Sequence, residues 1–145
     1  MDFKDCIKFA EEQHTAYFAT EENGQPRVRP IGLWFANEKG FYFQSSSAKS
    51  FGRQLQKNPK CQLCFYNPDL GGNIGTVMRV TGEVEFLDDM ALRTKIMEER
   101  PFLKNQGLTG PEDPRLLVFR VSKGEAFFWT MEYSARESEL ERIRF

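Results

Sequence analysis

The sequence predicts a mainly β, α+β fold: an antiparallel barrel of about six or seven strands with helices packed at its periphery. Short β-prone runs recur along most of the chain, and each is bounded by turn-forming residues. Only about one or two of the segments between strands have apolar residues at helical spacing. Gly82 stands in the middle of the longest strand candidate, where a bulge or bend would let a sheet curl.

Length and charge limit the classes of function. The 145 residues predict one domain, 1–145, large enough to bury a core without metals or disulfides. With 20 basic and 21 acidic residues, the net charge of −1 argues against nucleic-acid or membrane-surface binding by bulk electrostatics. Any anion that the protein binds must therefore be held by a few local groups.

Sequence features at the N-terminus and the cysteine count predict a cytoplasmic protein. No apolar run approaches the length of a bilayer span, so no membrane association is expected. Residues 1–6 lack the basic-then-apolar layout of a signal peptide. The three cysteines are an odd number, and we expect them to be reduced thiols.

The first part of the chain predicts a helix followed by two strands. Residues 2–13 carry apolar side chains at helical spacing, which predicts an amphipathic helix. Strands are predicted at 15–20 and 27–36, with a tight turn at Asn23-Gly24 between them. Alternation along the second strand puts Arg27 and Arg29 at the start of an otherwise apolar face, so both arginines could point toward a ligand.

The stretch 41–58 combines a strand, a polar loop and a short basic helix. An aromatic run at 41–43 ends in Ser45, Ser46 and Ser47, which are followed by Lys49 and a helix predicted at 50–57. Hydroxyls, free backbone N–H groups, the positive end of the helix dipole and an ammonium would converge there, which suits a phosphate dianion. The alternative is that Ser46 or Ser47 only caps the helix.

The second half of the chain predicts more strands around one crossover helix. A turn is expected at 37–40, a helix at 88–100, an irregular excursion at 101–114, and a tail at 131–145 in which helix and short strand are both open. The predicted strands are 60–67, 76–86, 116–122 and 125–130, the last two joined by Lys123-Gly124.

Three further patterns have simpler explanations. Cys61 and Cys64 resemble a C-x-x-C motif, but residues three apart on a strand project to opposite faces. A zinc site would lack ligands, because His14 is the single histidine. The glycine-rich stretch 71–75 lacks the helix and lysine of a nucleotide-binding P-loop and predicts a plain loop.

The order of these pieces resembles the pyridoxamine 5'-phosphate oxidase-like, FMN-binding split-barrel family. The resemblance rests on the hairpin G-Q-P-R-V-R-P, the segment F-Y-F-Q-S-S-S-A-K-S-F followed by N-P, and the later strand R-V-T-G-E-V. It runs from residue 15 to residue 86 and continues more loosely through E-E-R-P-F-L and the final strands. The resemblance implies a split β-barrel that forms a homodimer with FMN at the subunit interface.

Matching positions in this sequence give the residues that the resemblance implies for flavin binding. The second strand and the loop after the third strand would line the flavin, its ribityl chain and its phosphate, and the partner subunit would complete the site from around Trp129. The implied cofactor-binding residues are Arg27, Val28, Arg29, Pro30, Gln44, Ser45, Ser46, Ser47, Lys49, Ser50 and Trp129.

The expected function is that of a small flavin-dependent oxidoreductase acting on a small molecule. FMN would supply the redox chemistry, and the protein would supply binding, orientation and electrostatics. Lys49 with Arg27 or Arg29 would replace the water that a buried phosphate loses. The alternative is a non-catalytic flavin-binding or redox-sensing module.

Overall fold

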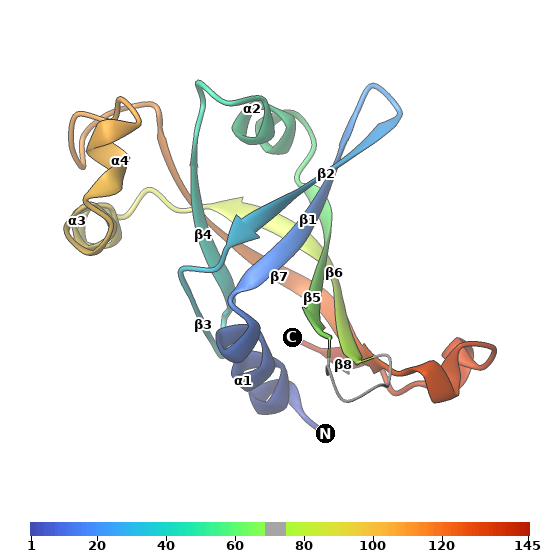
Figure 1. The fold of residues 1–145 in the computed structure, drawn as a ribbon. Coiled ribbons are helices and arrows are strands. Elements are labelled where there is room, and N and C mark those ends of the chain that lie inside the picture. Colours follow the sequence, from blue (N-terminus) through green and yellow to red (C-terminus); the bar gives the residue numbers. More distant parts are fainter. Residues whose placement is uncertain (69–74) are drawn as a thin grey trace.

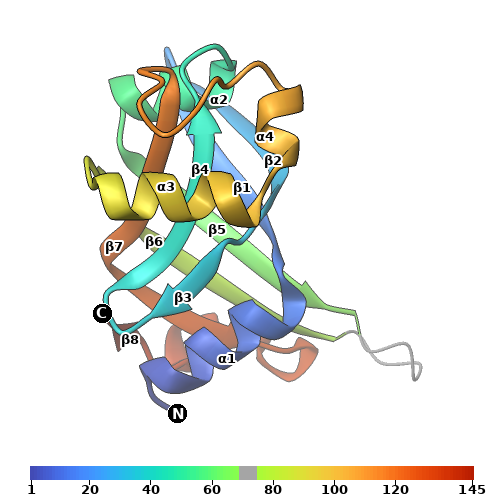
Figure 2. The same cartoon turned by 90° about the vertical axis from the view of Figure 1, so that its left-hand side faces the viewer.

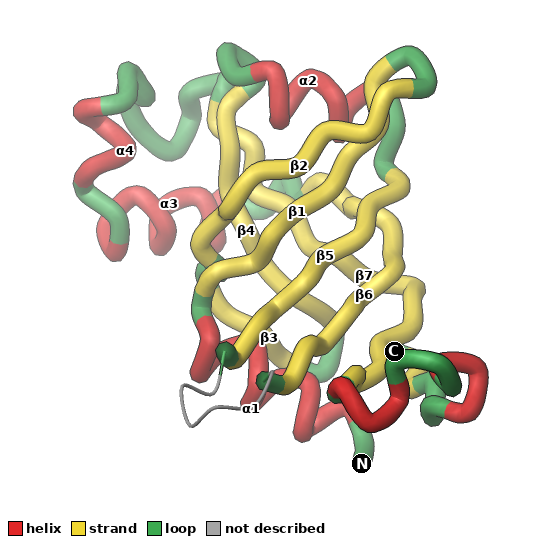
Figure 3. The backbone as a smooth tube through the Cα atoms, turned by 45° about the vertical axis from the view of Figure 1, so that its right-hand side comes forward, coloured by secondary structure: helices red, strands yellow, loops and turns green. Residues whose placement is uncertain are grey.

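The computed structural model describes residues 1–68 and 75–145, which form one antiparallel sheet curled into a split barrel (Figure 1, Figure 3). The eight strands follow the order β2-β1-β5-β6-β7-β4-β3, and β8 pairs with β7. This arrangement confirms the predicted mainly β fold. The strands are β1 (Thr15–Glu22), β2 (Gln25–Gly32), β3 (Phe35–Asn37), β4 (Gly40–Ser46), β5 (Lys60–Asn67), β6 (Thr76–Phe86), β7 (Leu116–Trp129) and β8 (Ile143–Arg144).

Helices cover both ends of the barrel and one side. Helix α1 (Phe3–Gln13) lies across one end and α2 (Ser50–Lys57) across the other (Figure 1). Helices α3 (Met90–Glu99) and α4 (Phe102–Asn105) lie beside β4 (Figure 2). Two short 3-10 helices, η1 (Met131–Tyr133) and η2 (Glu137–Glu139), follow β7 in the tail.

The barrel interior is filled mainly by phenylalanine. Side chains alternate along β1, so that Ala16 and Phe18 are fully buried while Tyr17 faces outward. Phe18 meets Phe43 and Phe119 edge to face, with ring centres 5.2 Å and 6.1 Å away. Burying one such ring stabilises the fold by roughly 2 to 3 kcal/mol, so this cluster is a large part of what holds the sheet closed.

The strand predicted at 27–36 is wrong as a single element. The chain breaks at Leu33 and Trp34, where the backbone changes partners: Leu33 N–H donates to the His14 carbonyl, and Trp34 N–H donates to the Tyr42 carbonyl. The chain thereby passes from the β1 edge of the sheet to the β4 edge. Strands β2 and β3 are the two edges of the sheet, and the barrel is split between them. The chain crosses this split at Leu33 and Trp34.

The hairpin predicted at Lys123-Gly124 is also wrong, because β7 runs continuously from 116 to 129. Its pairing with β6 shifts register between Thr81 and Glu83, so Lys123 and Gly124 form a bulge opposite Gly82, which confirms the irregularity predicted there. A Cβ on Gly124 would lie 1.8 Å from the Thr81 carbonyl oxygen, so the glycine permits a close approach that any side chain would block.

The crossover between β6 and β7 is fixed by a buried arginine. The guanidinium of Arg93 on α3 donates to the carbonyls of Pro111, Asp113 and Leu116 at 2.6 to 2.9 Å. These bonds order the excursion predicted at 101–114, within which α4 forms one short helix. These hydrogen bonds therefore hold α3 and the segment 101–114 together on the β4 side of the split.

Several remaining predictions can be compared with the described residues. Cys61 is buried and Cys64 half-buried, in keeping with their expected opposite faces. Most of the glycine-rich stretch at 71–75 lies outside the described residues, which resume at Gly75. Within the described ranges, no helix has the length and apolar character needed to cross a bilayer. The single-domain organisation of residues 1–145 stays a prediction.

Candidate functional site

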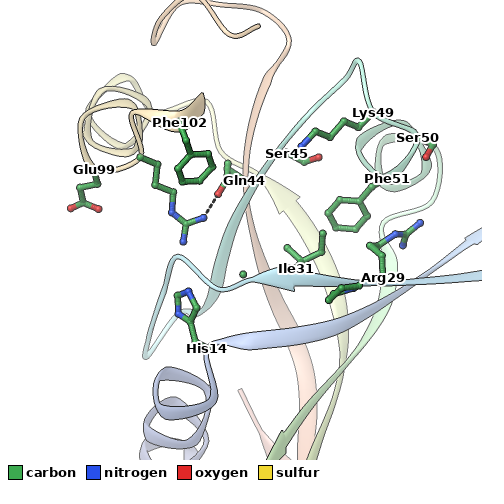
Figure 4. Close-up of a pocket in the computed structure, with 13 residues that line it drawn as sticks. His14, Arg29, Ile31, Gln44, Ser45, Lys49, Ser50, Phe51, Glu99 and Phe102 are labelled. Atoms are coloured by element: carbon green, nitrogen blue, oxygen red, sulfur yellow. Dashed lines mark hydrogen bonds between the residues drawn. The ribbon is translucent and has the colours of Figure 1, made fainter. Parts of the chain in front are cut away.

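A cavity of about 970 Å³ opens where the barrel splits, between β2 on one side and β4 on the other (Figure 4). We call it the split pocket. The start of α2 borders one end of it, and the end of α3 with the start of α4 borders the other. Its lining residues are His14, Arg29, Pro30, Ile31, Gly32, Gln44, Ser45, Lys49, Ser50, Phe51, Glu99, Arg100 and Phe102.

Helix α2 presents an uncapped N-terminus to this pocket. Lys49 is the N-cap residue, and among the described residues no side chain caps the helix. The serine-cap alternative is therefore wrong, because the Ser46 hydroxyl instead accepts a hydrogen bond from the Ala48 amide at 3.1 Å. Amides in the first turn of a helix have no partner inside the helix, so this end carries free donors and the positive end of the dipole.

A glycine lets α2 lie directly against the end of β4. A Cβ on Gly52 would lie 2.4 Å from the Ser46 carbonyl oxygen and 2.9 Å from a methyl carbon of Leu117. Any larger residue would push the helix away from the strand. Gly52 therefore allows the short distance between α2 and β4 that places the free amides of the helix at the pocket.

Ser45 adds a buried hydroxyl to the same end. Its residue is 5% exposed, and in the described structure its Oγ has no hydrogen-bond partner. Leaving a buried hydroxyl unpaired costs about 1 to 3 kcal/mol, which a ligand oxygen placed there would recover. Lys49 lies beside it, and its Nζ is 3.3 Å from Gln106 Oε1.

Arg29 enters the pocket from β2 and is held from several sides. Its Nη1 donates to the Phe18 carbonyl at 3.2 Å and to Thr20 Oγ1 at 2.7 Å, and its Nη2 donates to Gln54 Oε1 at 2.6 Å. The guanidinium also stacks over Phe51, 4.7 Å from the ring centre. Burial lowers the pKa of Arg29 from its ordinary value, although an arginine stays charged.

Arg100 is a second half-buried cation at the opposite end. Its Nη1 donates to Gln44 Oε1 at 2.6 Å and its Nη2 to the Leu33 carbonyl at 2.7 Å. Burial lowers its pKa as well. Phe102, 46% exposed, lies next to it on the rim of the pocket (Figure 4). The pocket thus has cations at both ends and apolar surface between them.

The structure brings together six of the residues expected from the sequence and leaves the others outside the pocket lining. Arg27 lies closer to the hairpin tip, where it forms an ion pair of 3.4 Å with Glu22, and Val28 is 69% exposed. Their expected roles in flavin binding stay predictions. The six that line the pocket are Arg29, Pro30, Gln44, Ser45, Lys49 and Ser50.

Ser46, Ser47 and Trp129 also lie outside the lining of the split pocket. Ser46 faces a small adjoining cavity of about 40 Å³. The Ser47 carbonyl accepts a hydrogen bond from Arg53 at 3.2 Å. Trp129 ends β7, where it pairs with Val77. Whether a partner subunit brings Trp129 to the site stays a prediction.

Sequence reasoning missed Arg100, Phe102 and Gln54, and it treated His14 as ordinary. The signal for Arg100 was a charged residue before Pro101, at the end of a helix that crosses between strands. His14 lines the pocket from a left-handed backbone, with φ of 65°. Among the residues that the structure describes, no cluster of His, Cys, Asp and Glu could hold a metal ion.

Fold and site together define a class of protein: a split β-barrel with a large pocket at the split that Arg29, Lys49 and Arg100 line. Comparison with known sequences gives the family. A sequence model described as pyridoxamine 5'-phosphate oxidase matches residues 4–130, and the chain belongs to this family.

Curated relatives match a shorter stretch. The chain is 35% identical over 75 residues to a pyridoxine/pyridoxamine 5'-phosphate oxidase from Burkholderia mallei. It is 30% identical over 74 residues to one from Agrobacterium fabrum. Each match covers 51% of this chain but only about a third, 33% and 34%, of those proteins.

Solved structures resemble the whole chain. A NimC/NimA family protein from Clostridium acetobutylicum is 30% identical, with a TM-score of 0.75 over 97% of this chain and 91% of that one. The General Stress Protein 26 from Bacillus anthracis, 17% identical, has a TM-score of 0.72 over the full length of both chains, 100% of each. An FAD-binding protein from Mesorhizobium loti, 16% identical, has a TM-score of 0.66 over 90% and 96% of the two chains.

Proposed function

We propose that the protein is a cytoplasmic FMN-binding flavoprotein that works as a small flavin-dependent oxidoreductase. The observation that carries the proposal is the concentration of free donors at the α2 end of the split pocket. An uncapped helix N-terminus, the Lys49 ammonium and the unpaired Ser45 hydroxyl converge there. Together they suit a phosphate dianion.

The residues present fit an FMN molecule lying along the pocket. Its phosphate would be held by Lys49, the Ser45 and Ser50 hydroxyls and the first amides of α2. Arg29 lies along the β2 wall and would meet the ribityl chain or the edge of the flavin ring, where a cation favours the reduced, more negative flavin. The volume of about 970 Å³ leaves room for a second small molecule.

When bound, FMN would supply electron transfer, and the chain would bind and orient the reactants. Arg100 offers N–H groups at the end away from Lys49, and two of its nitrogens are already fixed by Gln44 and Leu33. Phe102 offers an aromatic surface beside them. We therefore expect the second molecule to be planar and to carry an acidic group.

The outer face of the sheet supports a homodimer. Tyr17, 48% exposed, and Val28, 69% exposed, face outward on β1 and β2. Pro30 pairs with Tyr17 across these strands and also lines the split pocket. A partner covering this face would border the pocket, and Trp129 lies on the same face at β7. Light scattering of the flavin-bound protein tests this: a monomer at micromolar concentration would contradict the dimer.

The phosphate end can be tested with Lys49→Ala. We expect its affinity for FMN to fall by about one to two decades, because a charge-assisted contact is worth roughly 1.5 to 3 kcal/mol. Its affinity for riboflavin, which has no phosphate, should change little. Isothermal titration with both ligands measures this, and equal weakening of both would rule out the phosphate role of Lys49.

Turnover separates the oxidoreductase from a flavin-binding or sensing module without activity of its own. We expect the purified, FMN-loaded protein to consume NADH or NADPH steadily when an electron acceptor is present. Tight FMN binding with no turnover across a panel of donors and acceptors would favour the module. The absorption spectrum and mass of any co-purifying molecule test the cofactor directly.

A further inference from the structure

Gln54 on α2 has a buried side-chain amide and lies outside the lining of the split pocket. It is 5% exposed, and it lies on the face of α2 that packs against the barrel with Phe51 and Leu55. A glutamine is rarely buried to this extent unless its polar atoms are paired. The hydrogen-bond partners of Gln54 therefore indicate its structural role.

The hydrogen bonds of Gln54 fix which way its amide points. Its Oε1 accepts from Arg29 at 2.6 Å and from the Thr20 hydroxyl at 2.6 Å. Arginine can only donate, so the atom that faces Arg29 must be the oxygen. The amide nitrogen then points the other way and donates to Glu22 Oε2 at 3.4 Å.

This arrangement places a neutral amide between Arg29 and the nearby carboxylate. Glu22 forms its ion pair with Arg27, at 3.4 Å. In the described residues, Arg29 has no ion pair with any carboxylate; its partners are a carbonyl, a hydroxyl, an amide and a ring. The guanidinium is therefore fixed in direction, while no direct ion pair neutralises its charge beside the pocket.

We infer that Gln54 is a positioning residue: it aims the Arg29 guanidinium from α2 and, being neutral, leaves the arginine's charge available to an anionic ligand. This inference rests on the proposed function. It also links the two walls of the pocket, because the helix that would hold the phosphate also holds the arginine of β2. A carboxylate at position 54 would keep the hydrogen bond from Arg29 and neutralise the charge of the guanidinium.

The first experiment compares two matched substitutions on the same helix, Gln54→Glu and Gln56→Glu. Gln56 is exposed and lies outside the pocket lining, so it controls for added negative charge on α2. We expect Gln54→Glu to weaken the binding of reduced, anionic FMN by about 10- to 100-fold, the effect of neutralising one charged contact, and to weaken the binding of oxidised FMN less. Gln56→Glu should weaken both by less than about threefold. Equal effects of the two changes would overturn the inference.

The second experiment needs no flavin. The Nε–H signal of Arg29, identified by its loss in Arg29→Lys, is followed by nitrogen-15 NMR in the wild type, Gln54→Glu and Gln54→Leu. We expect a dispersed, narrow signal in the first two, and in Gln54→Leu a signal that shifts and broadens toward that of mobile arginines, because only the contacts with Phe18, Thr20 and Phe51 remain. An unchanged signal in Gln54→Leu would overturn the positioning role. If the wild type binds no FMN, the proposed function fails, and this comparison still decides the role of Gln54.

Discussion

Helices α2 and α3 begin in opposite ways. At α3, Asp89 is the N-cap, and its Oδ1 accepts from the amides of Ala91 and Leu92 at 2.9 Å and 3.2 Å. At α2 the N-cap is Lys49, whose side chain cannot accept a hydrogen bond and makes no capping bond to the helix. One helix satisfies its first amides within the chain, and the other leaves them facing the split pocket.

The difference between the two helices indicates that the uncapped start of α2 is less stable than a capped one and leaves its amides free for a ligand. A good N-cap stabilises a helix by about 1 kcal/mol, and a serine or aspartate before α2 would provide one. The sequence has three serines there, yet the hydroxyl of Ser45 stays unpaired and that of Ser46 bonds to Ala48. A cap at α2 would occupy the same amides that a phosphate needs.

The largest expected effect comes from making α2 resemble α3. Lys49→Asp supplies a capping carboxylate, removes a cation and places a negative charge where the phosphate would lie. We expect its affinity for FMN to fall at least about 100-fold, roughly 3 kcal/mol, while the free energy of unfolding rises by about 1 kcal/mol. Ligand titration and urea unfolding measure the two quantities.

Lys57→Asp is the control for Lys49→Asp, because it makes the same charge change at the far end of the same helix. It should leave the affinity for FMN within about threefold of the wild type. A Lys49→Asp protein that keeps its FMN affinity would remove the basis for contrasting the two helix ends.

A smaller effect is expected from changing how closely α2 packs against β4. Gly52→Ala would force its Cβ against the Ser46 carbonyl, 2.4 Å away. Overpacking of this kind costs about 3 kcal/mol, offset by about 1 kcal/mol of helix propensity, so we expect the free energy of unfolding to fall by about 2 kcal/mol. FMN affinity should fall too, because the amides move. Gly110→Ala, where the added Cβ meets nothing within 4 Å, should be nearly neutral in urea unfolding.

The smallest effect concerns α3 alone. Asp89→Ala removes the cap and should lower the free energy of unfolding by about 1 kcal/mol without changing FMN affinity. Asp88→Ala, its exposed neighbour, should change neither quantity by more than about 0.5 kcal/mol. Thermal unfolding with and without FMN measures both variants. A loss of FMN affinity in Asp89→Ala would mean that the two helix ends do not act separately.

Local sequence was sufficient to predict elements whose ends are marked by nearby residues. Helix α2 has the predicted bounds, 50–57, because Asn58-Pro59 ends it and the polar loop precedes it. Strands β5 and β6 also have their predicted bounds. Where the end of an element is set by its own neighbours, the sequence carries the information.

Contacts between distant segments could not be predicted in this way. Arg100 reaches Gln44 across 56 positions of sequence, and Arg29 reaches Gln54 across 25. The break at Leu33 depends on the chain moving from one sheet edge to another, which no local pattern encodes. The Lys123-Gly124 pair is typical of a turn, and only its pairing with a distant strand, where the register shifts opposite Gly82, shows that it is a bulge.

The position of β7 in the sheet has a consequence for the order of events during synthesis. Strand β7 lies between β6 and β4, yet it is made after both of them. Until it emerges from the ribosome, β4 lacks the strand that joins it to β6, and the apolar inner faces of both remain uncovered. Strand β4 ends at Ser46 and β7 begins at Leu116, so β4 waits for about half of translation before it can join the rest of the sheet. We therefore expect the nascent chain to depend on chaperones until β7 emerges.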